Sequence, residues 1–183
     1  MPRSWRDPRV PGDSLRLPPP ARDGLPEEVA SLVDLATPPG GGPPPTISVL
    51  AHQAALLEPF LAWAAALALH GVLPRRDHEI LALRTAWMFR SRFEWDEHVR
   101  FAHEAGLTDD EIGCIETDPA ASDWPSHEAA LLRAASELSA DHTIQDEIWE
   151  VLAAHYSSAA LIEILYVVGQ YAMLSMVANA IGA

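Results

Sequence analysis

The 183-residue chain contains one cysteine, Cys114, and only 12 basic residues against 26 acidic ones. A single cysteine excludes both an intrachain disulfide and a thiol pair for redox chemistry. The net charge of −14 predicts that nucleic acids are not partners, because phosphate binding requires clustered basic side chains. It also disfavours anionic membrane surfaces. A small-molecule substrate remains compatible, since the local charge of a pocket can oppose the net charge.

Long uninterrupted hydrophobic runs are also missing. No apolar run follows the arginines near the N-terminus, so we predict no signal peptide. The apolar stretch 49–69 is interrupted by Glu58 and Pro59, and the stretch 159–181 contains Glu163 and Gln170. We therefore predict no membrane span and a soluble cytoplasmic protein.

Proline is concentrated at the N-terminus, where residues 1–46 hold twelve of the 16 prolines. Proline lacks a backbone N–H and has a fixed φ, so residues 1–24 are predicted to be extended or disordered. A short helix is expected over 26–36, followed by a loop over 37–46. The chain length and a hydrophobic content of 49% predict one globular domain over 25–183.

From Ile47 onward the hydrophobic pattern is helical, and no strand alternation is visible. The fold class is therefore predicted to be all-α. A capping box at Thr108–Glu111 begins one of the helices, and a loop is expected over 118–125. The predicted helices cover residues 47–57, 59–70, 75–90, 93–105, 109–116, 126–140, 145–155 and 158–181.

Polar side chains interrupt the apolar face of the helix predicted over 93–105. At 100° per residue, Ser91, Glu94 and His98 lie in the middle of the apolar arc, and Glu94 and His98 are one turn apart. In the preceding helix, Glu79 is surrounded by apolar residues. Trp87 and Trp95 flank the polar group and are expected to line its pocket.

Three interpretations of Glu79, Glu94 and His98 remain open. Burying an unpaired carboxylate either destabilises the fold by several kcal/mol or raises the pKa of the group. A Glu–His–Glu cluster avoids both by sharing protons. Such a cluster is either an acid–base site or a structural pair that joins two helices. A metal site formed by the same three residues is the third interpretation, which the lack of an HExxH motif and of a repeated ExxH pair disfavours. The other histidines show no ligand spacing and are expected to be solvent-facing or helix-terminal.

The segment LPRRDHEILALRTAWMFRSRFEWDEHVRFAHEAGLTDDEI (73–112) resembles the core of the carboxymuconolactone decarboxylase family, which includes the alkylhydroperoxidase-D-like proteins. The resemblance extends over about residues 25–182. It implies an alkylhydroperoxidase-D-like helical bundle that forms a homo-oligomer, either a dimer, a trimer or a hexamer. The family's closing helix often reads YRML, whereas this chain has Tyr171-Ala172-Met173-Leu174.

The peroxidase branch of the family has a Glu, a CxxC motif and a His four residues after the second cysteine. Glu79 and His98 match that Glu and His, but Ser91 and Glu94 occupy the cysteine positions. Because thiol peroxide chemistry needs a thiolate, the chain is not expected to be a peroxidase.

The resemblance implies a cofactor-independent decarboxylase-like lyase or isomerase that acts on a lactone or a related enolisable acid. His98 suits the role of proton donor or enolate stabiliser, Glu79 would orient His98, and Glu94 could transfer the proton. Arg84 or Arg90 would pair with a substrate carboxylate. The predicted pocket comprises Ser91, Trp95, Trp87 and Arg84. The alternative is a non-catalytic relative of the thiol peroxidases with a binding or structural role.

Overall fold

The computed structural model describes residues 15–38, 40–117 and 124–183. Every regular element in this part of the chain is helical, so the predicted all-α class is confirmed. Two short 3-10 helices, η1 (Arg22–Gly24) and η2 (Ala51–Gln53), accompany the α-helices. The α-helices are α1 (Glu27–Leu35), α2 (Pro45–Leu50), α3 (Ala54–His70), α4 (Arg75–Met88), α5 (Arg92–Glu104), α6 (Asp109–Glu116), α7 (Ser126–Asp141), α8 (Asp146–His155) and α9 (Ser158–Ile181).

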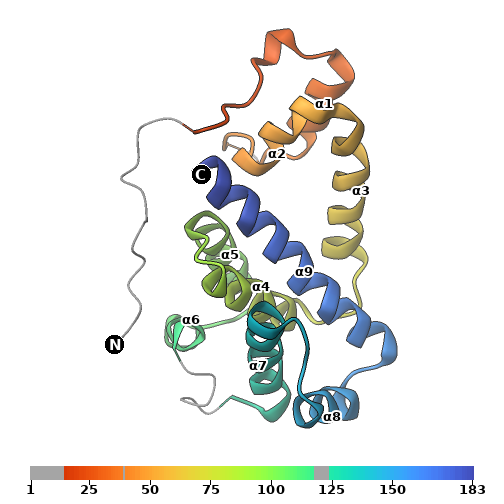
Figure 1. Cartoon of the computed structure of the whole chain (residues 1–183), viewed down its shortest axis with the longest axis vertical. Coiled ribbons are helices and arrows are strands. Elements are labelled where there is room, and N and C mark those ends of the chain that lie inside the picture. The colour runs from red at the N-terminus through yellow and green to blue at the C-terminus, as the bar shows by residue number, and fades with distance from the viewer. Residues whose placement is uncertain (1–14, 39, 118–123) are drawn as a thin grey trace. The chain divides into compact units, whose positions relative to one another are not determined.

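The described residues divide into two compact units. The site unit comprises Gly71–Met176, which includes α4 to α8 and most of α9 (Figure 1). The N-terminal unit comprises the described residues up to His70, together with Val177–Ala183. That residues 25–183 fold as one domain stays a prediction.

The core of the N-terminal unit is formed by α1, α2 and the start of α3. Its buried residues are Val29, Val33, Ile47, Ala51 and Leu57. Val29 and Val33 are four residues apart on α1, so one face of that helix points into this core.

The structure corrects the predicted helix boundary at Pro59. This residue lies inside α3, and the interruption occurs earlier, at the 3-10 turn η2. A proline in a helix removes the hydrogen bond to the carbonyl four residues before it, here that of Ala55. Ala55 is exposed, so water can solvate its carbonyl and the helix continues.

Within the site unit, α4 packs against α5, α6 and α7. All residues from Asp77 to Ala86 are buried, so α4 is enclosed on every side. Several of these residues are charged or polar. Because buried charges must be paired, the charged residues among them require partners on neighbouring helices.

The remaining predicted boundaries agree closely with the structure. The capping box at Thr108 and Glu111 is present at the start of α6, and α9 begins and ends at the predicted residues. Ser126 is the first residue of α7, after Pro125 at the N-cap position. Most of the predicted loop over 118–125 and of the N-terminal segment 1–24 lies outside the described residues.

Two helical stretches, Pro45–His70 and Ser158–Ile181, are long and apolar enough to cross a membrane. Core helices of soluble proteins share this property, and the absence of a membrane span stays a prediction. In the site unit, Glu163 of α9 accepts the backbone N–H groups of Val72 at 2.6 Å and Leu73 at 3.3 Å. This buried carboxylate therefore joins α9 to the chain that enters α4.

Candidate active site

A sharp turn between α4 and α5 determines which face of α5 points inward. Arg90 adopts the left-handed conformation (φ 55°), and the N–H of Ser91 donates to the carbonyl of Ala86 at 2.9 Å. This is the Schellman arrangement that ends a helix. The Ser91 hydroxyl then accepts the backbone N–H of Glu94 at 3.4 Å and caps α5. Ser91, predicted to line the pocket, is therefore fully buried as the N-cap of α5.

The inward face of α5 carries the residues that the helical projection places in the apolar arc. Glu94, Trp95 and His98 are buried, whereas Asp96 and Arg100 on the opposite side are exposed. The polar groups Glu94 and His98 are thus held in the interior of the site unit by the periodicity of the helix.

A short hydrogen bond joins α4 to α5. The Nδ1 atom of His98 lies 2.6 Å from Oε2 of Glu79, and the two side chains are only 10% and 5% exposed. An ionised carboxylate can only accept, so the Nδ1–H of His98 donates to Glu79. This bond fixes the ring orientation and leaves Nε2 as the nitrogen that can exchange a proton with another group.

Glu94 is a second buried carboxyl, one turn before His98 on α5. Burial raises the pKa of Glu94 to about 7, although the nearby His98 lowers it in part. A carboxyl group with a pKa near 7 can both give and take a proton at neutral pH. The structure therefore places an exchangeable proton beside the Glu79–His98 pair.

Tyr171 of α9 completes this cluster, and the sequence prediction of the site did not include it. Its ring meets that of His98 edge-on, with centroids 4.4 Å apart and an interplanar angle of 77°. Burial raises the pKa of Tyr171, and the charges of Glu79 and Glu94 raise it further, so the phenol stays protonated. The tyrosine of the closing-helix pattern was the available sequence signal, but it did not indicate a contact with α5.

His78 was also missed, because the histidines outside the motif were expected to be solvent-facing or helix-terminal. It lies in the first turn of α4 but is buried, and its Nε2 atom is 2.9 Å from the Tyr171 hydroxyl. Burial lowers the pKa of His78, so the ring is neutral at pH 7. A neutral imidazole can donate to the Tyr171 oxygen or accept its proton, depending on the tautomer.

Aromatic and cationic side chains adjoin the cluster. Trp87 and Trp95, both predicted to line the pocket, contact each other with centroids 5.9 Å apart. Phe101 lies one turn after His98, with ring centroids 5.6 Å apart. The guanidinium carbon of Arg100 is 4.2 Å from the Phe101 centroid, and that of Arg75 is 6.0 Å from it.

These two arginines differ in their other contacts. Arg100 pairs with Glu104 at 3.7 Å on the outer face of α5. Arg75 is exposed, and its charge lowers the pKa values of both His78 and Tyr171. The positive charge of Arg75 therefore acts on the interior cluster from its solvent side.

Arg84, predicted to bind a substrate carboxylate, is directed elsewhere. Its guanidinium donates to the carbonyls of Ile115 at 2.6 Å and Thr117 at 2.9 Å, and to the Ser136 hydroxyl at 2.7 Å. These contacts satisfy carbonyl groups at the C-terminal end of α6 and join α4 to α6 and α7. Arg84 thus has a structural role on the other side of α4 from Glu79.

The metal interpretation of Glu79, Glu94 and His98 gains no support from their geometry. Among the described residues, one set of three potential ligands has donor atoms within 4.8 Å of one another, and it comprises Asp77, His127 and Glu128. Glu79, Glu94 and His98 do not converge in this way. Their arrangement instead suits proton transfer, because it combines the oriented imidazole of His98, the Glu94 carboxyl with a pKa near 7 and the buried phenol of Tyr171.

Solved structures with a similar fold include two uncharacterised peroxidase-related proteins. The protein from Ralstonia eutropha JMP134, described as an alkylhydroperoxidase AhpD core, has 20% identity and a TM-score of 0.79, with 95% of this chain and 92% of that chain covered. The protein from Silicibacter sp. TM1040 has 19% identity and a TM-score of 0.80, with 95% and 93% covered.

A third similar structure is a Cys-to-Ala variant of the debrominase Bmp8 in complex with 2,3,4-tribromopyrrole. It has 18% identity and a TM-score of 0.74, with 91% of this chain and 89% of that chain covered. At these identities the similarities show a shared fold. They identify that fold as the predicted alkylhydroperoxidase-D-like helical fold.

Comparison of sequences gives one family match. No curated protein matches the chain. Residues 54–137 match the sequence model of the Carboxymuconolactone decarboxylase family, and this region contains Glu79, Glu94 and His98. The cluster therefore lies within the region that matches the carboxymuconolactone decarboxylase family.

Proposed function

We propose that the protein is a cofactor-independent lyase or isomerase that acts on a lactone or a related enolisable carboxylic acid. The observation that carries this proposal is the 2.6 Å hydrogen bond between Glu79 and His98, with the buried Glu94 of pKa about 7 beside it. The match of residues 54–137 to the carboxymuconolactone decarboxylase family supports the reaction class. The serine and glutamate at positions 91 and 94 argue against thiol chemistry.

In a decarboxylation of this type, the bond between the carboxylate carbon and the adjacent carbon breaks and CO₂ leaves. The electron pair moves through the ring alkene into the lactone carbonyl, which becomes a dienolate. A proton from the protein then adds to carbon, so that one proton is consumed for each CO₂ released. The protein must therefore stabilise an enolate oxygen and deliver one proton in a site that excludes water.

The cluster provides a group for each of these steps. His98, oriented by Glu79, is the proton donor through Nε2. Glu94 then transfers a proton to His98, because a carboxyl with a pKa near 7 can be protonated again at neutral pH. Tyr171 donates its hydroxyl proton to the enolate oxygen when His78 Nε2–H donates to the Tyr171 oxygen. A phenol whose pKa is raised remains a hydrogen-bond donor throughout the reaction.

Arg75 is the candidate for binding the substrate carboxylate, in place of Arg84. Its guanidinium is exposed, lies near Phe101 and acts electrostatically on Tyr171 and His78. Guanidinium groups bind carboxylates through two parallel hydrogen bonds, which also fixes the orientation of the bound acid.

A second candidate function is a non-catalytic, structural or binding role. The near-complete burial of the Glu79 and His98 side chains favours it, because a buried ion-pair-like contact can serve to hold two helices together. The two functions differ in one respect that can be measured. Only the catalytic role requires that replacing His98 affects turnover more than stability.

The test is conversion of carboxymuconolactone and related carboxylated lactones by wild-type protein and His98→Gln, followed by CO₂ release. We expect His98→Gln to lose about 10²-fold to 10⁴-fold in kcat, the usual contribution of a general acid–base group. His103→Gln is the matched control, since His103 also bonds a carboxylate, that of Asp109 at 2.9 Å, but is exposed. Equal turnover by wild-type and His98→Gln proteins would contradict the proposed function.

A further inference from the structure

We propose that Asp77, His127 and Glu128 form a binding site for a divalent transition-metal ion, separate from the Glu79–His98 pair. One potential donor atom from each residue lies within 4.8 Å of the other two. Asp77 comes from the first turn of α4, and His127 and Glu128 come from the first turn of α7. The two segments are distant in sequence, so no ligand spacing was visible along the chain.

The donor set suits a first-row divalent ion. It contains one imidazole and two carboxylates, the combination of nitrogen and oxygen donors that Zn²⁺ accepts. Mg²⁺ prefers oxygen donors and retains most of its water, so it fits this set less well. Three protein ligands leave a tetrahedral ion with one further coordination position.

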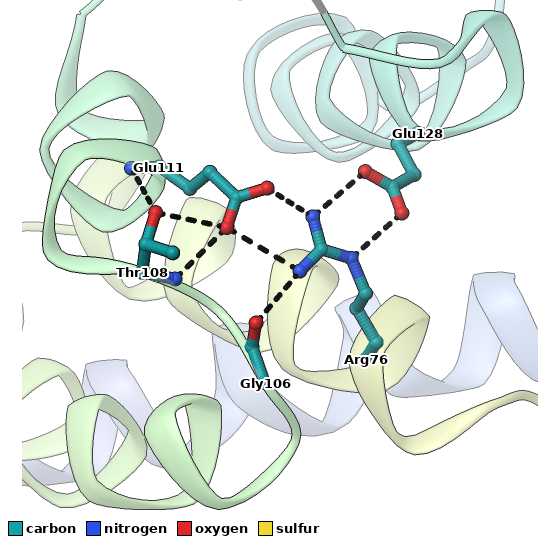
Figure 2. A network of polar contacts seen from close by, with 5 residues as sticks. All are labelled: Arg76, Gly106, Thr108, Glu111 and Glu128. Atoms are coloured by element: carbon teal, nitrogen blue, oxygen red, sulfur yellow. Dashed lines mark hydrogen bonds and ion pairs between the residues drawn. The ribbon is translucent and has the colours of Figure 1, made fainter.

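The charges around these residues require more positive charge than the nearby arginine provides. Figure 2 shows Arg76 between Glu111 and Glu128, with its Nε and Nη2 atoms 2.8 Å and 3.1 Å from the two Glu128 oxygens. One guanidinium thus serves two carboxylates. Asp77 is a third carboxyl group, buried next to Glu128, so three carboxyl groups lie around one permanently charged side chain.

Asp77 accepts a hydrogen bond from a neutral group, the Tyr156 hydroxyl, at 2.8 Å. A buried charge is normally paired with an opposite charge or bound to a metal, and a divalent cation would balance this group. The contact of Glu128 with Arg76 does not prevent ligation, because each carboxylate oxygen has two lone pairs.

The neighbouring side chains resemble the outer partners that orient metal ligands. Tyr156 holds the Asp77 carboxylate, and Arg76 holds that of Glu128. The His155 ring stacks on the His127 ring, with centroids 3.9 Å apart and an interplanar angle of 12°. Such contacts limit the freedom of the ligands before an ion binds, which favours binding.

The experiment uses full-length protein without a histidine tag, first treated with a chelator. Zn²⁺ is titrated by calorimetry, and Co²⁺ is titrated by its visible absorption, which reports the ligand geometry. We expect one ion per chain for the wild type. His127→Gln should weaken Zn²⁺ binding by more than about 100-fold, because loss of a ligand exceeds the effect of losing an outer partner.

Two matched variants make the result specific. His103→Gln removes an exposed histidine that bonds Asp109, and His98→Gln removes the histidine of the proposed active site. Both should bind Zn²⁺ as the wild type does. Asp77→Asn, if its circular dichroism is native, should lose binding as His127→Gln does.

Three outcomes would overturn the proposal. The first is a wild-type protein that binds neither Zn²⁺ nor Co²⁺ stoichiometrically. The second is unchanged binding by His127→Gln. The third is loss of binding by His98→Gln alone, which would assign the ion to the Glu79–His98 pair.

Discussion

The first two turns of α4 contribute to two polar clusters, and the clusters differ in the kind of positive charge that they contain. On one side, Arg76 binds Glu111 of α6 and Glu128 of α7 (the Arg76 cluster). On the other side, Glu79 binds His98 of α5, with Glu94 beside them (the Glu79 cluster). Both clusters contain two carboxylates and one basic group.

The basic group decides what each cluster can do. A guanidinium is permanently charged, and the hydrogen bonds from Arg76 lower the pKa of Glu111 to about 2. Glu111 therefore exchanges no proton near neutral pH, so the Arg76–Glu111 contact serves stability. An imidazole gains and loses its proton in the physiological range, and burial raises the pKa of Glu94 to about 7. The Glu79 cluster is therefore suited to proton transfer.

The largest effect is expected for Arg76→Ala, which would leave Glu128 buried without a cation. Removing one partner of a buried ion pair costs about 3–5 kcal/mol, and we expect the free energy of unfolding to fall by about this amount. Urea unfolding measures it. Arg92→Ala is the control, because Arg92 also pairs with a carboxylate, that of Asp96, but both side chains are exposed. Its free energy of unfolding should fall by less than about 1 kcal/mol.

Glu94→Gln should remove a pH dependence of stability. Between pH 4.5 and about 7, Glu94 is protonated in the folded protein and ionised in the unfolded chain, so the folded state binds more protons. The free energy of unfolding of the wild type should therefore fall, by up to about 3 kcal/mol, as the pH rises through this window.

Urea unfolding at several pH values checks this prediction. Glu94→Gln should flatten the slope and be more stable than the wild type above pH 7. Glu104→Gln, which changes an exposed carboxylate on the same helix, should leave the slope unchanged. A wild-type stability that rises with pH across this window would contradict the assignment of a raised pKa to Glu94.

Tyr171→Phe should lower kcat by about 100-fold, the effect of removing one donor to a developing oxyanion. Tyr156→Phe is a matched control on the other side of α4. Each tyrosine is buried and bonds a first-turn residue of α4, His78 for Tyr171 and Asp77 for Tyr156. Both changes should reduce stability, but only Tyr171→Phe should reduce turnover. Equal kcat losses would indicate a general structural effect.

The smallest effect is expected for Arg75→Gln, which should raise KM for a carboxylated lactone by about tenfold, or about 1.4 kcal/mol of binding. The expected kcat is close to that of the wild type, because Arg75 binds a part of the substrate that does not react. Arg100→Gln is the control, since Arg100 also lies over Phe101 but pairs with Glu104. A similar KM change in both variants would argue against a specific carboxylate contact.

Much of the helical architecture could be predicted from the sequence. The capping box of α6 and the ends of α9 follow from local patterns, because backbone hydrogen bonding and side-chain periodicity act within a few residues. The prediction failed at Pro59, where the helix continues because Ala55, the residue whose carbonyl loses its hydrogen bond, is exposed. Solvent exposure of one backbone group is a tertiary property.

The sequence by itself determined the helical class, the inward face of α5 and the presence of Glu79, Glu94 and His98 in apolar surroundings. Only the tertiary structure decided which groups meet. It pairs His98 with Glu79, adds Tyr171 and His78, directs Arg84 to α6 and α7, and brings Asp77 next to His127 and Glu128. Helix periodicity orders residues only within one helix, whereas contacts between helices depend on how the whole set of apolar faces packs together.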